Sequence, residues 1–237
     1  MRVNTYFHFK QFSVQHHNSA MKVGTDGVLL GAWAHVHREE TVLDAGTGTG
    51  LIALMLAQRT HGQAIIDAVE INALAAADAR ENFKQSPWVH SLNLAETSLQ
   101  HVASDKSYDL IISNPPYFIN SLKPPDTNRG IARHADTLTT QDLLIAAGSL
   151  LNVSGRLALI LPYKEGNSFR LLAAAHQFQV TRQCLFYTRS HKPPERWLLE
   201  LSRTPATLRE ETLILYEKEN QWSEAYINLT KDFYLNL

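Results

Sequence analysis

Short strand-like runs alternate with helical patterns along the middle of this chain, and this alternation limits the folds open to it. The strand-like runs are apolar and occupy residues 41–45, 64–69, 91–95, 108–113 and 156–161. Segments with apolar residues at helical spacing occupy residues 50–59, 73–84, 140–151 and 166–176. This order predicts an α/β fold, a mostly parallel, Rossmann-like sheet of seven or slightly more strands with helices on both faces.

The two ends of the chain follow other patterns. Alternating residues at 7–14 predict a short hairpin, and Thr25 or Asp26 can cap a helix that runs through Trp33. Near the other end, strand-like runs without an intervening helix predict an antiparallel edge of the sheet, at residues 178–187, 196–202 and 211–217. A closing helix is predicted at 222–234.

A chain of 237 residues is long enough for one domain with a sizeable core. We expect a single domain with an N-terminal hairpin and helix at 1–36, a core at 37–177 and an antiparallel edge with a closing helix at 178–237.

Composition excludes several classes of protein. Cys184 is the single cysteine, so an intramolecular disulfide is impossible and a reducing compartment is favoured. The sequence begins without the apolar stretch of a signal peptide, and no run of 18 apolar residues occurs. Eleven histidines show no spacing typical of a metal site. We therefore expect a cytoplasmic protein without a membrane span or a metal.

A glycine-rich turn follows the first strand of the alternating region. Gly46, Gly48 and Gly50 are spaced so that the chain can turn tightly and present backbone N–H groups beside a helix N-terminus. The next strand ends in Glu70, whose carboxylate can accept hydrogen bonds from a ribose diol. Position 51 is leucine, so the turn is not the G-x-G-x-x-G pattern of dinucleotide sites. The pattern indicates an adenosine ligand without a pyrophosphate, although such turns also serve only for packing.

Asp44 stands two residues before the first glycine. The turn thereby resembles the D-x-G-x-G-x-G motif of the S-adenosylmethionine-dependent methyltransferases, in which it holds the methionine part of the cofactor. This resemblance implies that S-adenosylmethionine is the cofactor and S-adenosylhomocysteine the product.

Asn114, Pro115, Pro116 and Tyr117 follow the fourth strand, at the edge of the sheet where the glycine turn also lies. A proline-stiffened turn would be the simpler interpretation. The tetrad resembles the signature of methyltransferases that modify a planar, conjugated nitrogen, such as adenine N6 or the glutamine amide. The lone pair of such a nitrogen is delocalised, so the reaction needs hydrogen-bond acceptors that localise it. The side-chain oxygen of Asn114 and the carbonyl of Pro115 are the candidates, and Tyr117 can stack on the base. We expect Asn114 to contact the cofactor as well.

Nearly the whole chain is similar to the bacterial tRNA1(Val) adenine-N6-methyltransferases, which belong to the class I methyltransferases. The matching segments are 9–12, 21–27, 30–33, 44–50, 111–117, 223–226 and 233–235. The resemblance implies methylation of the adenosine just 3′ of the anticodon, at position 37 of the tRNA. It also implies that residues 1–36 cover the cofactor site, with Lys22, Thr25 and Asp26 near the methionine end. Relatives often carry an acidic residue at the position of Ser98, so here a hydroxyl or backbone N–H would serve the cofactor adenine.

Net charge is near zero, with 22 lysines and arginines against 23 acids, but cations gather in three stretches. We expect tRNA phosphates to contact cations on the loop after Tyr117 and on the two other stretches. These residues are Lys10, Lys123, Arg129, Arg133, Arg189, Lys192 and Arg196. No obligate protein partner is evident.

Three other functions remain open from the sequence. A protein-glutamine N5-methyltransferase uses the same tetrad, but usually has a helical domain before the cofactor fold, and Asp44 comes too early for one. A DNA adenine methyltransferase usually contains an inserted target-recognition domain, and none is evident here. A non-catalytic RNA-binding module would keep the fold alone, and the intact tetrad beginning at Asn114 disfavours it.

Overall fold

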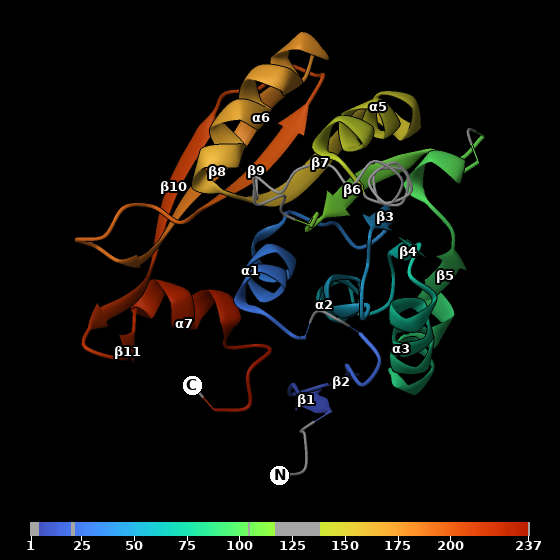
Figure 1. The fold of residues 1–237 in the computed structure, drawn as a ribbon, viewed down its shortest axis with the longest axis horizontal. Helices are drawn as coiled ribbons and strands as arrows, with labels where there is room; N and C mark the ends of the chain where they lie inside the picture. Colours follow the sequence, from blue (N-terminus) through green and yellow to red (C-terminus); the bar gives the residue numbers. More distant parts are fainter. Residues whose placement is uncertain (1–4, 20–21, 104, 117–137, 237) are drawn as a thin grey trace, which may run out of the picture.

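One nine-stranded sheet forms the centre of the computed structural model, which describes residues 5–19, 22–103, 105–116 and 138–236 (Figure 1). The order across the sheet is β11-β10-β8-β9-β7-β6-β3-β4-β5. The parallel part comprises β3 (Thr41–Ala45), β4 (Ile65–Glu70), β5 (Leu92–Glu96), β6 (Tyr108–Ser113) and β7 (Leu151–Pro162). The predicted α/β fold with a mostly parallel sheet is confirmed.

Helices cover both faces of this sheet and bury two apolar cores (Figure 1). One core lies under α1 (Thr25–Trp33), α2 (Leu51–Arg59), α3 (Ala73–Gln85) and α7 (Glu224–Thr230); the other lies under α5 (Thr140–Leu150) and α6 (Tyr163–Ala175). Successive residues of a strand point to opposite faces. In β6, Leu110 and Ile112 accordingly enter the first core and Ile111 the second.

The antiparallel edge differs in part from the prediction. It consists of β8 (Gln179–Arg189), β9 (Arg196–Ser202), β10 (Arg209–Lys218) and β11 (Gln221–Trp222). Strand β9 lies between β7 and β8 and is antiparallel to both, as predicted. Strand β10, however, is parallel to β8. Because β9 already has two neighbours, the returning chain passes to the outer side of β8 and pairs there.

Two details at the ends of the chain correct the predictions. The hairpin is present as β1 (Tyr6–His8) and β2 (Ser13–Gln15). Helix α1 is preceded by Gly24 at its N-cap position without a side-chain cap, so the prediction of a cap from Thr25 or Asp26 was wrong. Helix α7 is shorter than the predicted 222–234 at both ends: Ser223 caps its start by accepting a hydrogen bond from the Tyr226 amide at 3.0 Å, and turns follow Thr230.

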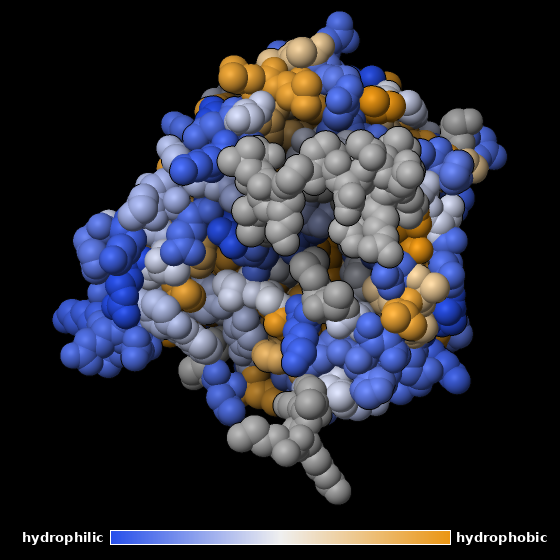
Figure 2. All heavy atoms as spheres, viewed as in Figure 1, coloured by the Kyte–Doolittle hydropathy of each residue, from blue (hydrophilic) through white to orange (hydrophobic). Residues whose placement is uncertain are grey.

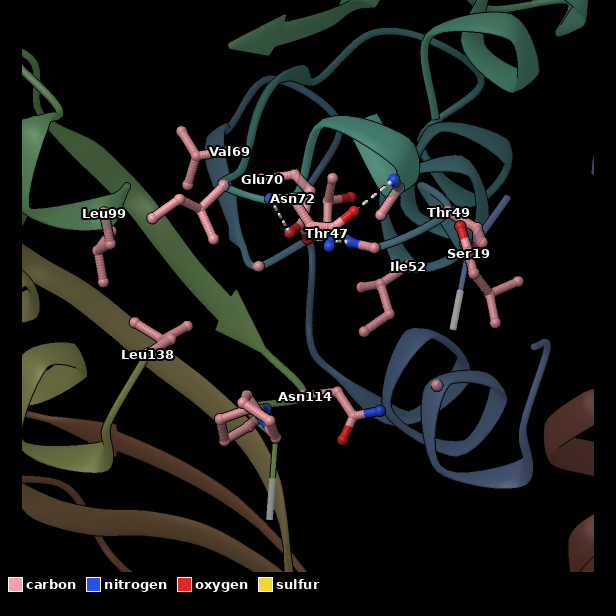
Figure 3. Close-up of a pocket in the computed structure, with 18 of the residues that line it drawn as sticks. Ser19, Thr47, Thr49, Ile52, Val69, Glu70, Asn72, Leu99, Asn114 and Leu138 are labelled. Carbon is pink, nitrogen blue, oxygen red and sulfur yellow. Dashed lines mark hydrogen bonds between the residues drawn. The ribbon is translucent and has the colours of Figure 1, made fainter. Parts of the chain in front are cut away.

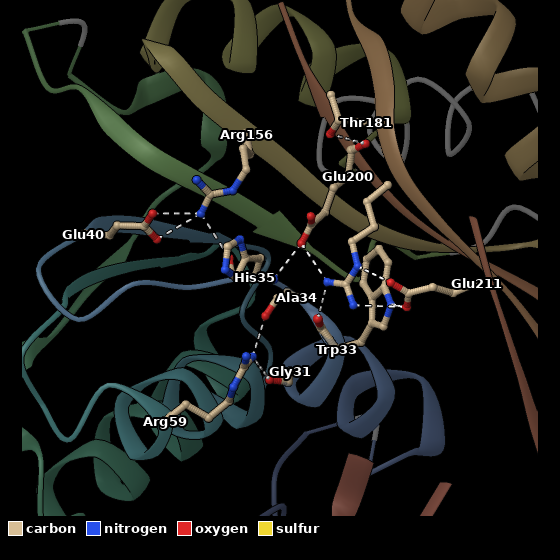
Figure 4. A network of polar contacts seen from close by, with 11 residues as sticks. Gly31, Trp33, Ala34, His35, Glu40, Arg59, Arg156, Thr181, Glu200 and Glu211 are labelled. Atoms are coloured by element: carbon tan, nitrogen blue, oxygen red, sulfur yellow. Dashed lines mark hydrogen bonds and ion pairs between the residues drawn. The ribbon is translucent and has the colours of Figure 1, made fainter. Parts of the chain in front are cut away.

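The C-terminal end of α1 is held by arginines from three other elements (Figure 4). Arg59 donates to the carbonyls of Gly31 and Ala34, Arg182 to that of Trp33, and Arg156 to that of His35. The last carbonyls of a helix lack partners within the helix and carry partial negative charge, which cations stabilise. This end of α1 is therefore fixed, and the opposite end lies at the pocket described below.

The described surface on the side shown in Figure 2 is largely hydrophilic, with hydrophobic residues gathered at its upper edge, over α6.

Two short 3-10 helices, Val89–Ser91 and Leu99–His101, flank β5. Among the described residues, no helix combines the length and the apolar character that a membrane crossing requires.

Candidate functional site

A pocket of about 570 Å³ opens at the carboxyl ends of β3, β4, β5 and β6 (Figure 3). This is the edge at which open parallel sheets bind ligands, and the volume is typical of small-molecule sites. Its lining comprises Ser19, Lys22, Gly24, Asp26, Gly27, Gly46, Thr47, Gly48, Thr49, Leu51, Ile52, Val69, Glu70, Ile71, Asn72, Ala75, Thr97, Ser98, Leu99, Gln100, Asn114, Pro115, Pro116 and Leu138.

The three glycines of the turn have different surroundings. All have positive φ, with values of +73° for Gly46, +59° for Gly48 and +82° for Gly50. A Cβ added to Gly48 would meet no atom within 4 Å, so its open side faces free space. A Cβ on Gly50 would instead collide with the ring of Phe83. Gly46 and Gly48 line the pocket and Gly50 does not, so Gly50 serves the packing of the turn against α3.

Glu70 connects the glycine turn to the start of α3. Its Oε2 accepts a hydrogen bond from the Gly48 amide at 2.9 Å, and its Oε1 accepts one from the Asn72 amide, also at 2.9 Å. Each carboxylate oxygen can accept a further bond, and Glu70 lines the pocket (Figure 3). The side chain is therefore oriented for a ligand that donates two hydroxyl groups.

Asp44 lies beneath the turn and outside the pocket lining. Its Oδ2 accepts hydrogen bonds from the Thr47 hydroxyl at 2.6 Å and the Ala53 amide at 3.2 Å. Its Oδ1 is buried without a hydrogen-bond partner in the described part of the chain. Burial raises the pKa of Asp44 to about 7, against the lowering effect of the bonds from Thr47 and Ala53. Asp44 thus supports the turn and the start of α2 from behind.

The first turn of α1 and the residues directly before it form another wall. Lys22, Gly24 and Asp26 line the pocket, whereas Thr25 does not. Asp26 accepts hydrogen bonds from Nε of Arg196 at 3.0 and 3.1 Å. Arg196 also donates to the carbonyl of Glu195. Part of the guanidinium of Arg196, predicted to contact phosphate, is thus directed to the protein itself.

The end of the pocket beyond β5 is formed by residues 97–100, including Ser98. The Ser98 hydroxyl lies 3.0 Å from Nδ1 of His101. Because Ser98 lines the pocket, a bound ligand can reach it, as the prediction of an adenine contact requires.

Asn114, Pro115 and Pro116 lie at the end of β6, and Asn114 faces the pocket opposite Glu70 and Thr47 (Figure 3). The end of β6 is tied to the glycine turn, because the Ser113 hydroxyl donates to the carbonyl of Ala45 at 2.7 Å. The other predicted residues of this region, namely Tyr117, Lys123, Arg129 and Arg133, lie outside the described residues.

The remaining predicted cations are spread over the surface. Lys10 donates to the carbonyl of Lys231 at 2.7 Å, and Arg189 stacks on Tyr216 at 5.4 Å and donates to Asn220. Lys192 is exposed in the turn between β8 and β9. These positions leave the proposed contacts with phosphate as predictions.

Sequence reasoning missed several residues of the pocket. Asn72 carries a usable signal, because an asparagine directly before a helical pattern is a typical N-cap, and its Oδ1 accepts from the Leu74 and Ala75 amides. Ser19 and Leu138 carry none, since each reaches the pocket from a distant, irregular segment. Among the described residues, no three histidine, cysteine, aspartate or glutamate side chains are grouped as metal ligands would be.

Comparisons with known proteins agree with this geometry. A family model described as the methyltransferase small domain matches residues 19–184. A tRNA1(Val) (adenine(37)-N6)-methyltransferase of Parabacteroides distasonis is 47% identical and spans 99% of this chain and 99% of its own. Its counterpart in Histophilus somni strain 2336 is 43% identical over 97% of each chain.

A solved structure supports the fold. A predicted O-methyltransferase of Agrobacterium tumefaciens matches with a TM-score of 0.69 at 18% identity, over 88% of this chain and 96% of that one. The chain therefore belongs to the methyltransferase small-domain family and, within it, to the tRNA1(Val) (adenine(37)-N6)-methyltransferases.

Proposed function

We propose that this protein transfers a methyl group from S-adenosylmethionine to N6 of an adenosine in tRNA, at position 37 of tRNA1(Val). The observation that carries the proposal is that Asn114 and the two prolines after it face a pocket whose opposite wall is the glycine turn with Glu70. The relatives named for this reaction match the chain over nearly its full length.

The residues of the pocket fit the proposed cofactor. The open side of Gly48 leaves room for a ligand against the backbone, and Glu70 can accept both hydroxyl hydrogens of a ribose. Lys22 and Asp26 carry the charges that suit the carboxylate and ammonium of the methionine part. Ser98 and its neighbours would bind the adenine. When bound, S-adenosylmethionine supplies an electrophilic methyl group and leaves as S-adenosylhomocysteine.

Asn114 and Pro115 provide the acceptors that the target amine needs. The amine lone pair is delocalised into the adenine ring, and hydrogen bonds from the amine to the Asn114 side-chain oxygen and the Pro115 carbonyl favour a tetrahedral nitrogen. With the nitrogen held in this way, its lone pair would be directed at the electrophilic methyl group that the bound cofactor supplies. The methylated nitrogen is acidic, so water can accept its proton without a strong general base.

The prolines keep this geometry fixed. Pro115 and Pro116 each have a restricted φ, which limits the motion of the acceptors relative to the cofactor wall. Tyr117 is proposed to stack on the target base. The base must leave its stack to enter the pocket, so an exposed anticodon loop is a more accessible substrate than a duplex. We propose phosphate contacts from six of the predicted cations, without Arg196, whose guanidinium donates to Asp26 and to the Glu195 carbonyl. Among the described ones, Lys10 and Lys192 are exposed.

The experiment compares the wild-type protein with Asn114→Ala. Each is incubated with methyl-labelled S-adenosylmethionine and tRNA from cells that lack the enzyme, and the nucleosides are identified by mass spectrometry. We expect N6-methyladenosine from the wild type and a loss of at least about a hundredfold in the variant, as for the removal of a transition-state hydrogen bond. Binding of S-adenosylhomocysteine should weaken far less than methyl transfer, because the other pocket residues are unchanged.

Asn93→Ala is the matched control, because Asn93 lies on β5 and bonds to Asp67 away from the pocket. It should retain activity. A tRNA1(Val) transcript with guanosine at position 37 should accept no methyl group. Label in protein instead of tRNA would favour the glutamine methyltransferase, and cofactor binding without any transfer would favour a binding module.

A further inference from the structure

The segment before α1 reaches the pocket from the N-terminal hairpin. We call residues 15–19 the strap: it begins at Gln15, the last residue of β2, and ends at Ser19, which lines the pocket. The strap contains no helix or strand beyond Gln15. Its position therefore depends on side-chain contacts with the rest of the protein.

Asp78, on the buried face of α3, provides most of these contacts. Its Oδ2 accepts hydrogen bonds from the Asn18 amide, the Ser19 amide and the Ser19 hydroxyl, at 2.9, 2.9 and 2.8 Å. Its Oδ1 accepts from the side-chain amides of Asn18 at 2.9 Å and Gln15 at 3.4 Å. One carboxylate thus receives five donors, all of them from the strap.

Asn82 lies one helical turn further along α3 and joins the strap to the glycine turn. Its Oδ1 accepts from the Gln15 amide at 2.7 Å, and its Nδ2 donates to the Gln15 carbonyl at 2.9 Å and the Thr49 carbonyl at 2.8 Å. Because residues four apart share a face of a helix, Asp78 and Asn82 form one anchoring surface. This surface fixes the strap relative to the backbone of the pocket.

The contacts of Asp78 are charge-assisted and shielded from solvent. The side chain is fully buried, and such bonds are stronger than those between neutral groups. Burial alone would raise the pKa of Asp78, but the bonds from Ser19 and Asn18 hold it below its usual range. The carboxylate is therefore ionised at neutral pH, and removal of the carboxylate would leave all five donors without this acceptor.

Asp78 does not line the pocket itself. We propose that Asp78 is a positioning residue for the cofactor, which it serves by holding the strap so that Ser19 lies against the bound molecule. The inference rests on the proposed cofactor and does not depend on the proposed RNA substrate.

The test measures binding of S-adenosylhomocysteine by titration calorimetry, without RNA, to the full-length protein. Asp78→Ala should raise the Kd at least about tenfold. Asp78→Asn keeps one oxygen that can accept from the backbone N–H groups of Asn18 and Ser19. The side-chain amides of Asn18 and Gln15 can rotate so that their oxygens accept from the new NH2 group, and the Kd should therefore rise only two- to fivefold. Glu81→Ala is the control, because Glu81 is a half-buried carboxylate of the same helix that lies outside the pocket lining and bonds only to Gln85 among the described residues.

Two further readouts separate positioning from a general loss of structure. In methyl transfer, KM for S-adenosylmethionine should rise with the Kd, while kcat at saturating cofactor stays within about threefold. Hydrogen exchange should become faster at the Asn18 and Ser19 amides and stay unchanged in the glycine turn. Combined with Ser19→Ala, which removes one of the donors, Asp78→Ala should have less than its full effect.

The proposal would be overturned if hydrogen exchange of the strap became faster in Asp78→Ala while the Kd for S-adenosylhomocysteine stayed equal to that of Glu81→Ala. A fall in kcat with an unchanged KM for S-adenosylmethionine would also overturn it. If Asp78→Ala fails to fold, Asp78→Asn decides the matter by the same two measurements. Absence of methyl transfer to every tRNA would contradict the proposed function, yet the calorimetric result would still decide the role of Asp78.

Discussion

Asp26 and Arg196 lie 170 residues apart in the sequence and form an ion pair at the wall of the pocket, with Nε of Arg196 donating to both carboxylate oxygens at 3.0 and 3.1 Å. The pair connects the first turn of α1 to the start of β9. Asp26 lines the pocket and Arg196 does not. The arginine therefore orients a carboxylate that the cofactor would meet.

Replacement of Arg196 by alanine should weaken cofactor binding about fivefold, equivalent to about 1 kcal/mol for a partly exposed pair. The slope of log K for tRNA against log salt should stay unchanged, because the bonds to Asp26 and Glu195 direct the guanidinium inward. Calorimetry with S-adenosylhomocysteine and tRNA filter binding at several salt concentrations measure the two effects.

Lys192→Ala is the matched comparison, since Lys192 is exposed on the turn that precedes Arg196. Here the salt slope should fall by about 0.7 to 0.9, the value for one lost phosphate contact, and cofactor binding should be unaffected. An equal fall in slope for Arg196→Ala would instead assign Arg196 to the RNA.

Asp44 predicts an unusual dependence of stability on pH. Burial raises its pKa from 3.8 to about 7, so between these values the folded protein holds a proton that the unfolded chain has released. The free energy of unfolding from this residue must then fall as pH rises from about 4 to 7. Asp44→Asn, which stays neutral and can still accept from Thr47 or Ala53, should flatten this decline. Denaturant unfolding at pH 5, 6, 7 and 8 measures it.

Asp67 is the control, because its contribution to the free energy of unfolding should change with pH in the opposite direction. Burial alone would raise its pKa, but bonds from Lys106, Tyr108 and Asn93 lower it below 3.8. Its contribution to stability is present at neutral pH and is lost as pH falls below about 4. Asp67→Asn should therefore destabilise the protein at pH 7. If Asp44→Asn shows the same dependence of the free energy of unfolding on pH as the wild type, the interpretation of Asp44 is contradicted.

The features that the sequence predicted are those with a local pattern. Three strands lead to the glycine turn, to Glu70 and to Asn114. Because the residues of each strand point alternately into the two cores, the end of each strand, and with it the pocket residue, could be placed. The parallel pairing of β10 could not be predicted, since alternation within a strand does not identify its neighbour. Asp78 was missed for a similar reason: its partners lie about 60 residues earlier, and nothing in the spacing joins them.

The partners of Arg182 also lie on other elements, namely α1, β9 and β10, and predict a large effect on stability. Arg182 pairs with Glu211 at 2.7 Å and with Glu200 at 3.6 Å, and its guanidinium stacks 4.1 Å from the centre of the Trp33 ring (Figure 4). Glu200 is buried, so Arg182→Ala leaves a buried charge without this partner and should cost about 3–5 kcal/mol in the free energy of unfolding.

Arg182→Lys should lose less, because it keeps the charge and loses the bidentate bonds to Glu211. Arg203→Ala serves as the control: Arg203 stacks on Phe178 at 5.6 Å and is exposed, so its loss should stay below about 1 kcal/mol. Guanidinium denaturation of the three variants gives the comparison. A loss in Arg182→Ala no greater than in Arg203→Ala would show that the network adds little.

Gly48 and Gly50 should respond differently to alanine, although both have positive φ. The change at Gly48 costs about 1–2 kcal/mol of backbone strain, and the new methyl group enters free space on the pocket side. Gly48→Ala should therefore fold and bind S-adenosylhomocysteine at least about tenfold more weakly. At Gly50 the methyl group collides with the buried ring of Phe83, so we expect overpacking of about 1–3 kcal/mol in addition to the strain. Unfolding and calorimetry on both variants separate the two roles, and unchanged cofactor binding by Gly48→Ala would show that the cofactor does not approach the turn at this residue.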